Sequence, residues 1–106
     1  MWRFEYLNEV VRSELRAQPD EIRAKFTRIL NLINVKGLES VREPYIKHLD
    51  GKLWEMRVTG KDGIARAIYV TASERRIVVL RVFTKKTEKT PHSELDLARR
   101  RAKEIR

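Results

Sequence analysis

The chain has 106 residues, of which 42% are hydrophobic, and it carries 24 Lys and Arg against 15 Asp and Glu, a net charge of +9. This hydrophobic content excludes a disordered chain, and no apolar run is long enough to cross a bilayer or form a secretory signal, so we expect one cytoplasmic domain over residues 1–106. The absence of cysteine and the two widely separated histidines give no basis for a disulfide, a metal site or a cofactor.

The positive charge is concentrated in the second half of the sequence. After Leu53 there are fourteen Lys and Arg and seven Asp and Glu, so 14 − 7 = +7 of the net +9 lies there. Clustered positive charge attracts polyanions and gives salt-dependent contacts with phosphate. It therefore favours nucleic acid or an acidic protein as the partner, with a generally basic, solvated surface as the alternative.

The N-terminal third predicts a strand followed by two helices. "WRFEY", residues 2–6, alternates aromatic and charged side chains with the two-residue period of a half-buried strand. A helix is expected over residues 8–18, with Asn8 as its N-cap and its end before Pro19. In the second helix, capped by Asp20, apolar residues recur every three or four positions up to Ile33, and Gly37 suits its C-terminal stop.

Residues 38–51 contain Pro44 and the turn pair Asp50-Gly51, and we interpret them as a loop. Three strands are then predicted, which form an antiparallel meander. In "KLWEMRV" the side chains of one face are Trp54, Met56 and Val58, and those of the other are Leu53, Glu55 and Arg57. "IARAIYV" places on one face Ile64, Arg66, Ile68 and Val70.

The third strand, "IVVLRVF", is apolar on both faces, which predicts a central position covered on both sides. One face has Ile77, Val79, Arg81 and Phe83, and the other has Val78, Leu80 and Val82. A C-terminal helix follows, with Thr90 as N-cap and Pro91 at its first position. The order of elements predicts an α+β fold, in which helices cover a curled, mainly antiparallel sheet.

The segments "KLWEMRV", "ARAIYV" and "IVVLRVFTKKTEKTP" carry a resemblance to a known family. Together they resemble the RelE/ParE toxin superfamily, in particular its HigB-like branch of phage Gp49-related proteins. The resemblance covers Lys52 to Pro91, and the two preceding helices agree with it in order and size. It implies a RelE-like α+β fold, with an N-terminal strand and two helices packed on the sheet and a C-terminal helix.

The resemblance also implies a function. RelE-like and HigB-like members are toxins of type II toxin–antitoxin systems, and they are ribosome-dependent endoribonucleases that cleave messenger RNA without a metal. The implied partners are messenger RNA on the ribosome, ribosomal RNA and a cognate helix-turn-helix antitoxin similar to HigA. ParE-like members of the same fold inhibit DNA gyrase instead. A non-enzymatic gyrase inhibitor and a plain RNA-binding module therefore remain as alternatives.

Cleavage through the neighbouring 2′-hydroxyl needs cations that stabilise the phosphate and groups that move protons. Arg66 falls where RelE-like toxins carry a phosphate-stabilising arginine, although it could also be an arginine whose stem packs on the sheet. Arg57 shares a strand face with Glu55 and could serve the phosphate or form an ion pair with that carboxylate. Glu55 and His92 are candidates for proton transfer, but flanking arginines would make Glu55 a poorer base, and His92 could be an exposed residue of the first helical turn.

The segment after the third strand contains several lysines, which are suited to contact the phosphate backbone of RNA. Lys85, Lys86 and Lys89 are the candidates for RNA binding, and Lys85 is also a candidate catalytic cation. Arg81 could join them or pair with a carboxylate. The following helix would present a ribosome-facing or solvated surface of Arg99, Arg100, Arg101, Lys103 and Arg106. Trp54 and Tyr69 are expected in the core.

Overall fold

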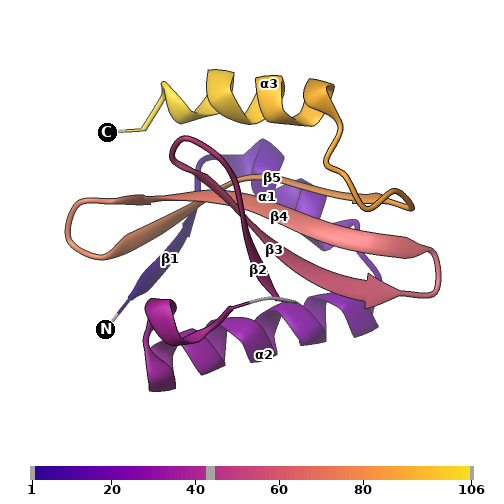
Figure 1. Cartoon of the computed structure of the whole chain (residues 1–106), viewed down its shortest axis with the longest axis horizontal. Helices are drawn as coiled ribbons and strands as arrows, with labels where there is room; N and C mark the ends of the chain where they lie inside the picture. Colours follow the sequence, from indigo (N-terminus) through magenta and orange to yellow (C-terminus); the bar gives the residue numbers. More distant parts are fainter. Residues whose placement is uncertain (1, 43–44, 106) are drawn as a thin grey trace.

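The computed structural model describes residues 2–42 and 45–105 (Figure 1). The helices are α1 (Glu9–Arg16), α2 (Asp20–Lys36), the short 3-10 helix η1 (Leu38–Ser40) and α3 (His92–Ala102). The strands are β1 (Arg3–Tyr6), β2 (Ile46–Asp50), β3 (Leu53–Gly60), β4 (Gly63–Ala72) and β5 (Arg76–Lys85). The α+β class and the order of the expected elements are confirmed. No helix within the described ranges is long and apolar enough to cross a membrane.

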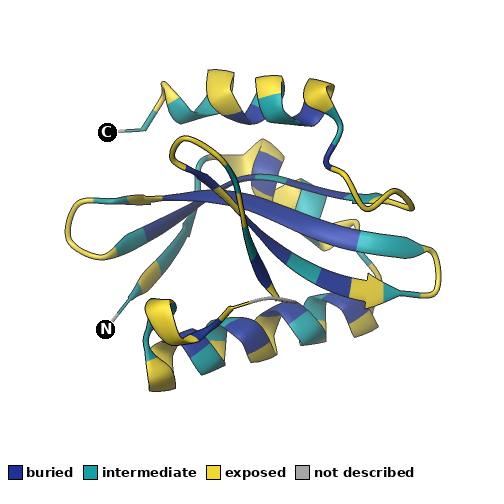
Figure 2. Ribbon diagram, viewed as in Figure 1, coloured by how far each residue is buried: buried dark blue, intermediate teal, exposed yellow. Residues whose placement is uncertain are grey.

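The five strands form one mixed sheet in the order β1-β5-β4-β3-β2. The predicted meander is β3-β4-β5, and β1 pairs parallel with the start of β5. In Figure 1 α2 lies on one face of the sheet and α3 on the other. Figure 2 shows buried residues running along β4 and β5 between these two layers, which confirms the central, doubly covered position predicted for β5.

The sequence interpretation of residues 38–51 as a loop is wrong. Ile46–Asp50 is the strand β2, which pairs antiparallel with β3, and Gly51 and Lys52 form the turn between them. The side chain of Ile46 is buried, whereas the rest of β2 is half-buried or exposed, as is usual for a strand at the edge of a sheet. Pro44, which was assigned to the loop, lies outside the described residues.

A β-bulge at Leu80 reverses the predicted faces in the second half of β5. Leu80 has no partner on β4, because the residues before and after it pair with consecutive residues of that strand. An extra residue shifts the two-residue alternation by one position. The expected grouping of Phe83 with Ile77 and Val79 is therefore wrong, since Phe83 packs on the α3 side of the sheet and Val82 on the α2 side.

The helix termini agree with the sequence prediction in part. Asn8 caps α1 by accepting a hydrogen bond from the backbone N–H of Val11, at 3.1 Å, and Gly37 ends α2 with a positive φ of 88°. Asp20 and Thr90 are not N-caps, since α2 already includes Asp20 and α3 begins at His92. Pro19 precedes α2 and Pro91 precedes α3, and each proline occupies the cap position without a side-chain hydrogen bond.

The predictions for the two aromatic core residues and for the basic C-terminal surface are confirmed in part. Tyr69 is buried as predicted, but the prediction of a core position for Trp54 is wrong, since its side chain is 38% exposed. Of the basic residues predicted for the surface of the C-terminal segment, Arg99, Arg100 and Lys103 are exposed. Arg106 lies outside the described residues.

Arg101 is a structural residue and not part of a solvated surface. Its guanidinium donates to the backbone carbonyl of Leu80 at 2.7 Å and pairs with the Glu14 carboxylate at 3.0 Å. Glu14 in turn accepts from the backbone N–H of Val82 at 3.0 Å. The two side chains thus satisfy backbone groups on either side of the bulge, where β5 extends beyond its pairing with β1.

Replacing Glu14 by glutamine is expected to lower the free energy of unfolding at neutral pH by about 1–3 kcal/mol, since Glu14 accepts charge-assisted hydrogen bonds. Burial alone would raise the pKa of Glu14, but hydrogen bonds from Arg101 and the Val82 N–H and the charge of Arg81 bring it below its ordinary value of 4.5. A carboxyl group with a lowered folded-state pKa stabilises the fold above its unfolded pKa, and that contribution is lost as the pH falls through the folded value.

The Glu14→Gln variant and the parent chain should therefore converge in stability as the pH falls through the lowered folded-state pKa of Glu14, which urea unfolding at a series of pH values measures. Glu9→Gln on the same helix is the matched control. Among the described residues Glu9 pairs with the exposed arginines Arg12 and Arg16, and we expect a change of about 0.5 kcal/mol or less. A Glu14→Gln difference that stays constant down to acidic pH would contradict the assigned role of the charge.

Candidate functional site

Arg66 lies in the middle of the sheet with its side chain fully buried. On β4 it pairs with Arg57 of β3 on one side and with Phe83 of β5 on the other. Its guanidinium carbon is 6.0 Å from the centroid of the Phe83 ring. The sequence predicts Arg66 on the same face of β4 as Ile68. In the structure this is the face that α3 covers further along the strand.

Glu55 connects Arg66 to its neighbours. Its carboxylate is fully buried, accepts a hydrogen bond from Arg57 Nε, and lies 3.7 Å from Arg66 Nε. The Thr90 hydroxyl donates to its second oxygen at 2.7 Å. Of the two interpretations of Arg57, the structure therefore shows the ion pair. Both carboxylate oxygens of Glu55 are engaged, which leaves this group poorly placed to take a proton from a substrate.

The two arginines hold the segment that carries the lysines. Arg66 Nη2 donates to the backbone carbonyls of Thr87 and Glu88, the latter at 2.9 Å, and Arg57 Nη2 donates to the Glu88 carbonyl as well. We call residues 85–90 the lysine loop. Its lysine side chains, Lys85, Lys86 and Lys89, are all exposed.

The guanidinium of Arg66 is not fully used in this arrangement. Within the described part of the chain, its Nε and Nη1 are buried and have no hydrogen-bond partner. Burial lowers the pKa of Arg66, and the Glu55 carboxylate acts in the opposite direction. Because a guanidinium stays protonated even so, the lysine loop covers a cation that has spare donors.

Two other predicted site residues lie outside this cluster. Arg81 is engaged by two carboxylates, Glu94 at 2.7 and 3.1 Å and Glu14 at 2.9 Å. The hydrogen bonds to Glu94 raise the pKa of Arg81 above its ordinary value. The alternative in which Arg81 pairs with a carboxylate is thus the one that the structure shows. His92 is exposed at the first position of α3 and forms no hydrogen bond or ion pair with the described residues.

The sequence interpretation missed a cleft that adjoins the lysine loop. This cleft has a volume of about 680 Å³ and runs from α2 along β3, beyond its pairing with β2, to Glu88. Its cations are Lys25 and Arg28 of α2 together with Arg57, whose side chain is 12% exposed. Tyr45, which is 47% exposed, adds an aromatic ring. Lys25 and Arg28 have the helical spacing that puts side chains on one face, but only the packing of α2 shows where that face lies.

The chemistry of this region is that of an anion-binding surface. Arginines with planar, fixed donors suit phosphate oxygens, exposed lysines suit a phosphate backbone, and an exposed aromatic ring can stack on a base. His92 is an exposed titratable group at the start of α3, whereas Glu55 is enclosed by its partners. The structure brings together Arg57, Arg66, Glu55 and the lysine loop, and leaves Arg81 in a separate ion-pair network.

Comparison with protein families gives one match. Residues 13–103 match the model of the family described as "Phage derived protein Gp49-like (DUF891)", which lies within the RelE/ParE-like toxin superfamily of toxin–antitoxin systems. No protein with a curated description matches the chain. The family match covers α2, all strands from β2 to β5 and α3, and therefore every residue of the cluster just described.

Proposed function

The chain belongs to the Gp49-like family of toxin–antitoxin toxins, and on that basis we propose that it is a ribosome-dependent endoribonuclease that cleaves messenger RNA. The observation that supports this proposal most strongly is the position of the lysine loop. Its exposed lysines adjoin a cationic cleft, and its backbone is held by Arg57 and Arg66. Phosphate contacts of this kind fix the register of RNA and are sensitive to salt.

The proposed reaction is attack of a 2′-hydroxyl oxygen on the adjacent phosphorus. The 2′-oxygen–phosphorus bond forms and the bond to the 5′-oxygen breaks, while one proton leaves the 2′-hydroxyl and one reaches the 5′-oxygen. In this proposal Arg66, Arg57 and Lys85 stabilise the extra charge on the phosphate. His92, which is exposed, is the proposed proton carrier. Glu55 positions the two arginines, since both of its oxygens are already bonded.

Arg66 can contact a phosphate only if the lysine loop moves. In the described structure its side chain is fully buried beneath the carbonyls of Thr87 and Glu88. We propose that RNA binding to the lysines lifts these carbonyls away, so that the Arg66 guanidinium meets the phosphate through the freed Nη2 and its spare donors. Such an opening exchanges two carbonyl acceptors for two anionic oxygens, which are the stronger acceptors.

The ribosome is the proposed setting because the exposed cations extend beyond the loop. The outer surface of α3 presents Arg99, Arg100 and Lys103, and ribosomal RNA is the polyanion that would face it. The cognate antitoxin that the family implies is proposed to be a helix-turn-helix protein, and the cytoplasm is the proposed location. Mapping of transcript 5′ ends on translating ribosomes tests the activity. Growth arrest without new 5′ ends would favour the gyrase-inhibitor alternative, and RNA binding without arrest would favour a plain binding module.

Removing two lysines of the loop is expected to weaken RNA binding in a salt-dependent way. For Lys85→Ala/Lys86→Ala, the slope of log affinity against log salt concentration should become shallower by roughly 1.4, since each phosphate contact to a single strand contributes about 0.7. Fluorescence anisotropy with a labelled single-stranded RNA measures this slope. The matched control, Lys36→Ala/Lys52→Ala, removes the same charge from exposed positions outside the loop, and an equal change in the control would contradict a localised RNA site.

A further inference from the structure

The lysine loop contains one carboxylate, that of Glu88. In Figure 1 the loop joins the end of β5 to the start of α3. The Glu88 side chain is 85% exposed, but its carboxylate lies 3.3 Å from Nη1 of Arg57 and accepts a hydrogen bond from it. Among the described residues that line the cationic cleft, Glu88 is also the one with a negative charge. A carboxylate therefore lies within a surface whose cations suit phosphate.

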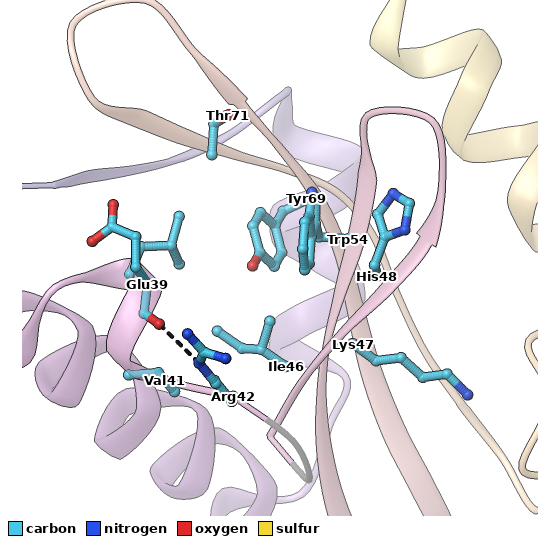
Figure 3. A pocket seen from close by; sticks show the side chains of 10 residues that line it. Glu39, Val41, Arg42, Ile46, Lys47, His48, Trp54, Tyr69 and Thr71 are labelled. Carbon is cyan, nitrogen blue, oxygen red and sulfur yellow. Dashed lines mark hydrogen bonds between the residues drawn. The ribbon is translucent and has the colours of Figure 1, made fainter.

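Glu88 holds both terminal nitrogens of Arg57. The Nε of Arg57 donates to the Glu55 carboxylate, Nη1 to the Glu88 carboxylate and Nη2 to the Glu88 backbone carbonyl. An arginine grips phosphate through two of its three nitrogens, and any two of them include one that Glu88 holds. In the pocket of Figure 3, by contrast, Arg42 donates to the backbone carbonyl of Glu39 at 3.3 Å, while the Glu39 carboxylate points away from it. Glu88 thus occupies the position at which Arg57 would bind a phosphate.

The charge of Glu88 also acts on Arg66. Burial lowers the pKa of Arg66, and the nearby carboxylates of Glu55 and Glu88 act in the opposite direction. Glu88 therefore offsets part of the positive charge of both arginines that are proposed to stabilise the phosphate. A phosphate that approached them would meet a like charge at close range, where the repulsion is significant even in water. The affinity for RNA is lowered as long as this carboxylate stays in place.

Glu88 differs from Glu55 in that its carboxylate can leave the arginines. The Glu55 carboxylate is fully buried and bonded through both oxygens. The Glu88 carboxylate has no hydrogen bond or ion pair among the described residues other than the one to Arg57. Because exposed side chains change rotamer rapidly, the carboxylate can release Arg57 without any change of fold.

We propose that Glu88 is an internal competitor of the RNA phosphate and thereby lowers the affinity of the site for RNA. In the empty site its carboxylate pairs with Arg57, and on binding the phosphate takes its place while the carboxylate turns into solvent. One anion is exchanged for another, so binding depends on the further phosphate contacts that RNA makes with the lysines. The inference rests on the proposed function for the nature of the ligand, but it does not require that the RNA is cleaved.

The alternative is that the pair of Glu88 with Arg57 acts as a latch that keeps the lysine loop closed. The loop is already held by hydrogen bonds that involve no Glu88 carboxylate, from Arg57 and Arg66 to the backbone carbonyls of Thr87 and Glu88. An exposed carboxylate adds little to such a set of bonds. The two interpretations differ in the free protein, because loss of a latch would speed amide hydrogen exchange in the loop and loss of a competitor would not.

The test is the affinity of Glu88→Gln for a labelled single-stranded RNA whose 2′-hydroxyls are methylated so that it cannot be cleaved, measured by fluorescence anisotropy. The dissociation constant is expected to fall about fivefold at low salt, as for removing the repulsion of two unit charges in water, and the gain should shrink as salt screens the charges. Glu74→Gln is the matched control, because Glu74 is 80% exposed, pairs with Arg3 at 3.4 Å and lies at the opposite end of β5 from the loop. Its affinity should stay within about twofold of that of the parent chain.

Equal gains in Glu88→Gln and Glu74→Gln would overturn the proposal, because they would reflect net charge alone. So would an affinity of Glu88→Gln no higher than that of the parent chain, including binding by neither, or a gain accompanied by faster amide exchange in the lysine loop of the free variant. Tighter binding by Glu88→Gln without new transcript 5′ ends on translating ribosomes would refute only the ribonuclease function. New 5′ ends together with unchanged affinity would refute the competition and leave that function standing.

Discussion

Replacing Arg66 by methionine is expected to lower the rate of RNA cleavage by a factor of 100 or more while the chain remains folded. The expected loss follows from the proposed role, because removing one preorganised donor to a developing anion commonly costs about 10²–10³ in rate. Methionine has a similar length to the arginine stem and fills the space beside Phe83. The change therefore removes the cation without leaving a large void.

The fold should tolerate this replacement because the cluster has a surplus of buried positive charge. Glu55 keeps Arg57 as its partner when Arg66 is removed, and the buried donors Nε and Nη1, which have no hydrogen bond among the described residues, disappear. The interactions lost are the bonds from Arg66 to the carbonyls of Thr87 and Glu88 and its 3.7 Å contact with the Glu55 carboxylate. We expect the free energy of unfolding to fall by no more than about 2 kcal/mol.

Mapping of 5′ ends on translating ribosomes measures the first effect, and urea unfolding measures the second. Arg66→Lys is the informative companion, because it keeps the charge but loses the planar fork that binds two oxygens, and we expect intermediate activity. Parental cleavage by Arg66→Met would show that Arg66 only holds the lysine loop. In that case Arg57 and His92 would be the remaining candidates for the catalytic roles.

The regular strands could be predicted from the sequence because their pairing has no irregularity. The two-residue alternation grouped Glu55 with Arg57 on β3 and Arg66 with Ile68 on β4, and the structure adds that Arg57 and Arg66 are cross-strand partners. The closeness of Arg57 and Arg66 follows from the register of a short hairpin. Local sequence patterns were sufficient here because the relevant contacts are between adjacent strands.

The alternation in β5 failed because its bulge depends on residues far away in the sequence. The backbone groups beside Leu80 are satisfied by Glu14 of α1 and Arg101 of α3, and no pattern within the strand shows such partners. The strand β2 was missed for a related reason. Its polar side chains suit an edge position, and of the Asp50-Gly51 pair, interpreted as part of a loop, Asp50 ends β2 and Gly51 begins a hairpin turn.

In the candidate site, too, some features follow from local sequence patterns and others depend on tertiary packing. The residue types and the family resemblance pointed to Arg66 and the lysine loop, but not to the carbonyls that the arginine holds. Thr90 was expected to cap a helix, and its hydroxyl instead donates to Glu55, 35 residues earlier. The cleft beside the loop depends on how α2 packs against β3. Such features follow from tertiary packing, which one sequence without relatives does not reveal.

Replacing Glu55 by glutamine is expected to have the largest effect on stability of any single change in the cluster. It leaves the guanidinium groups of Arg57 and Arg66 without their buried carboxylate, and breaking a buried ion pair by removing one partner commonly costs about 3–5 kcal/mol. The glutamine can keep the hydrogen bond from Thr90 but not the charge. Urea unfolding measures the change, and Glu74→Gln is the control, since the pair that Glu74 forms with Arg3 is exposed and worth about 1 kcal/mol or less.

The double variant Glu55→Gln/Arg66→Met decides whether charge imbalance is the cause. If two uncompensated guanidinium groups produce the loss, removing one of them should restore part of the stability, so that the double variant is more stable than Glu55→Gln alone. A coupling of about 1–3 kcal/mol is expected for residues in one ion-pair network. Strictly additive losses would mean that Glu55 acts through packing and its bond to Thr90, and that the surplus cation is already compensated by the carbonyls of the lysine loop.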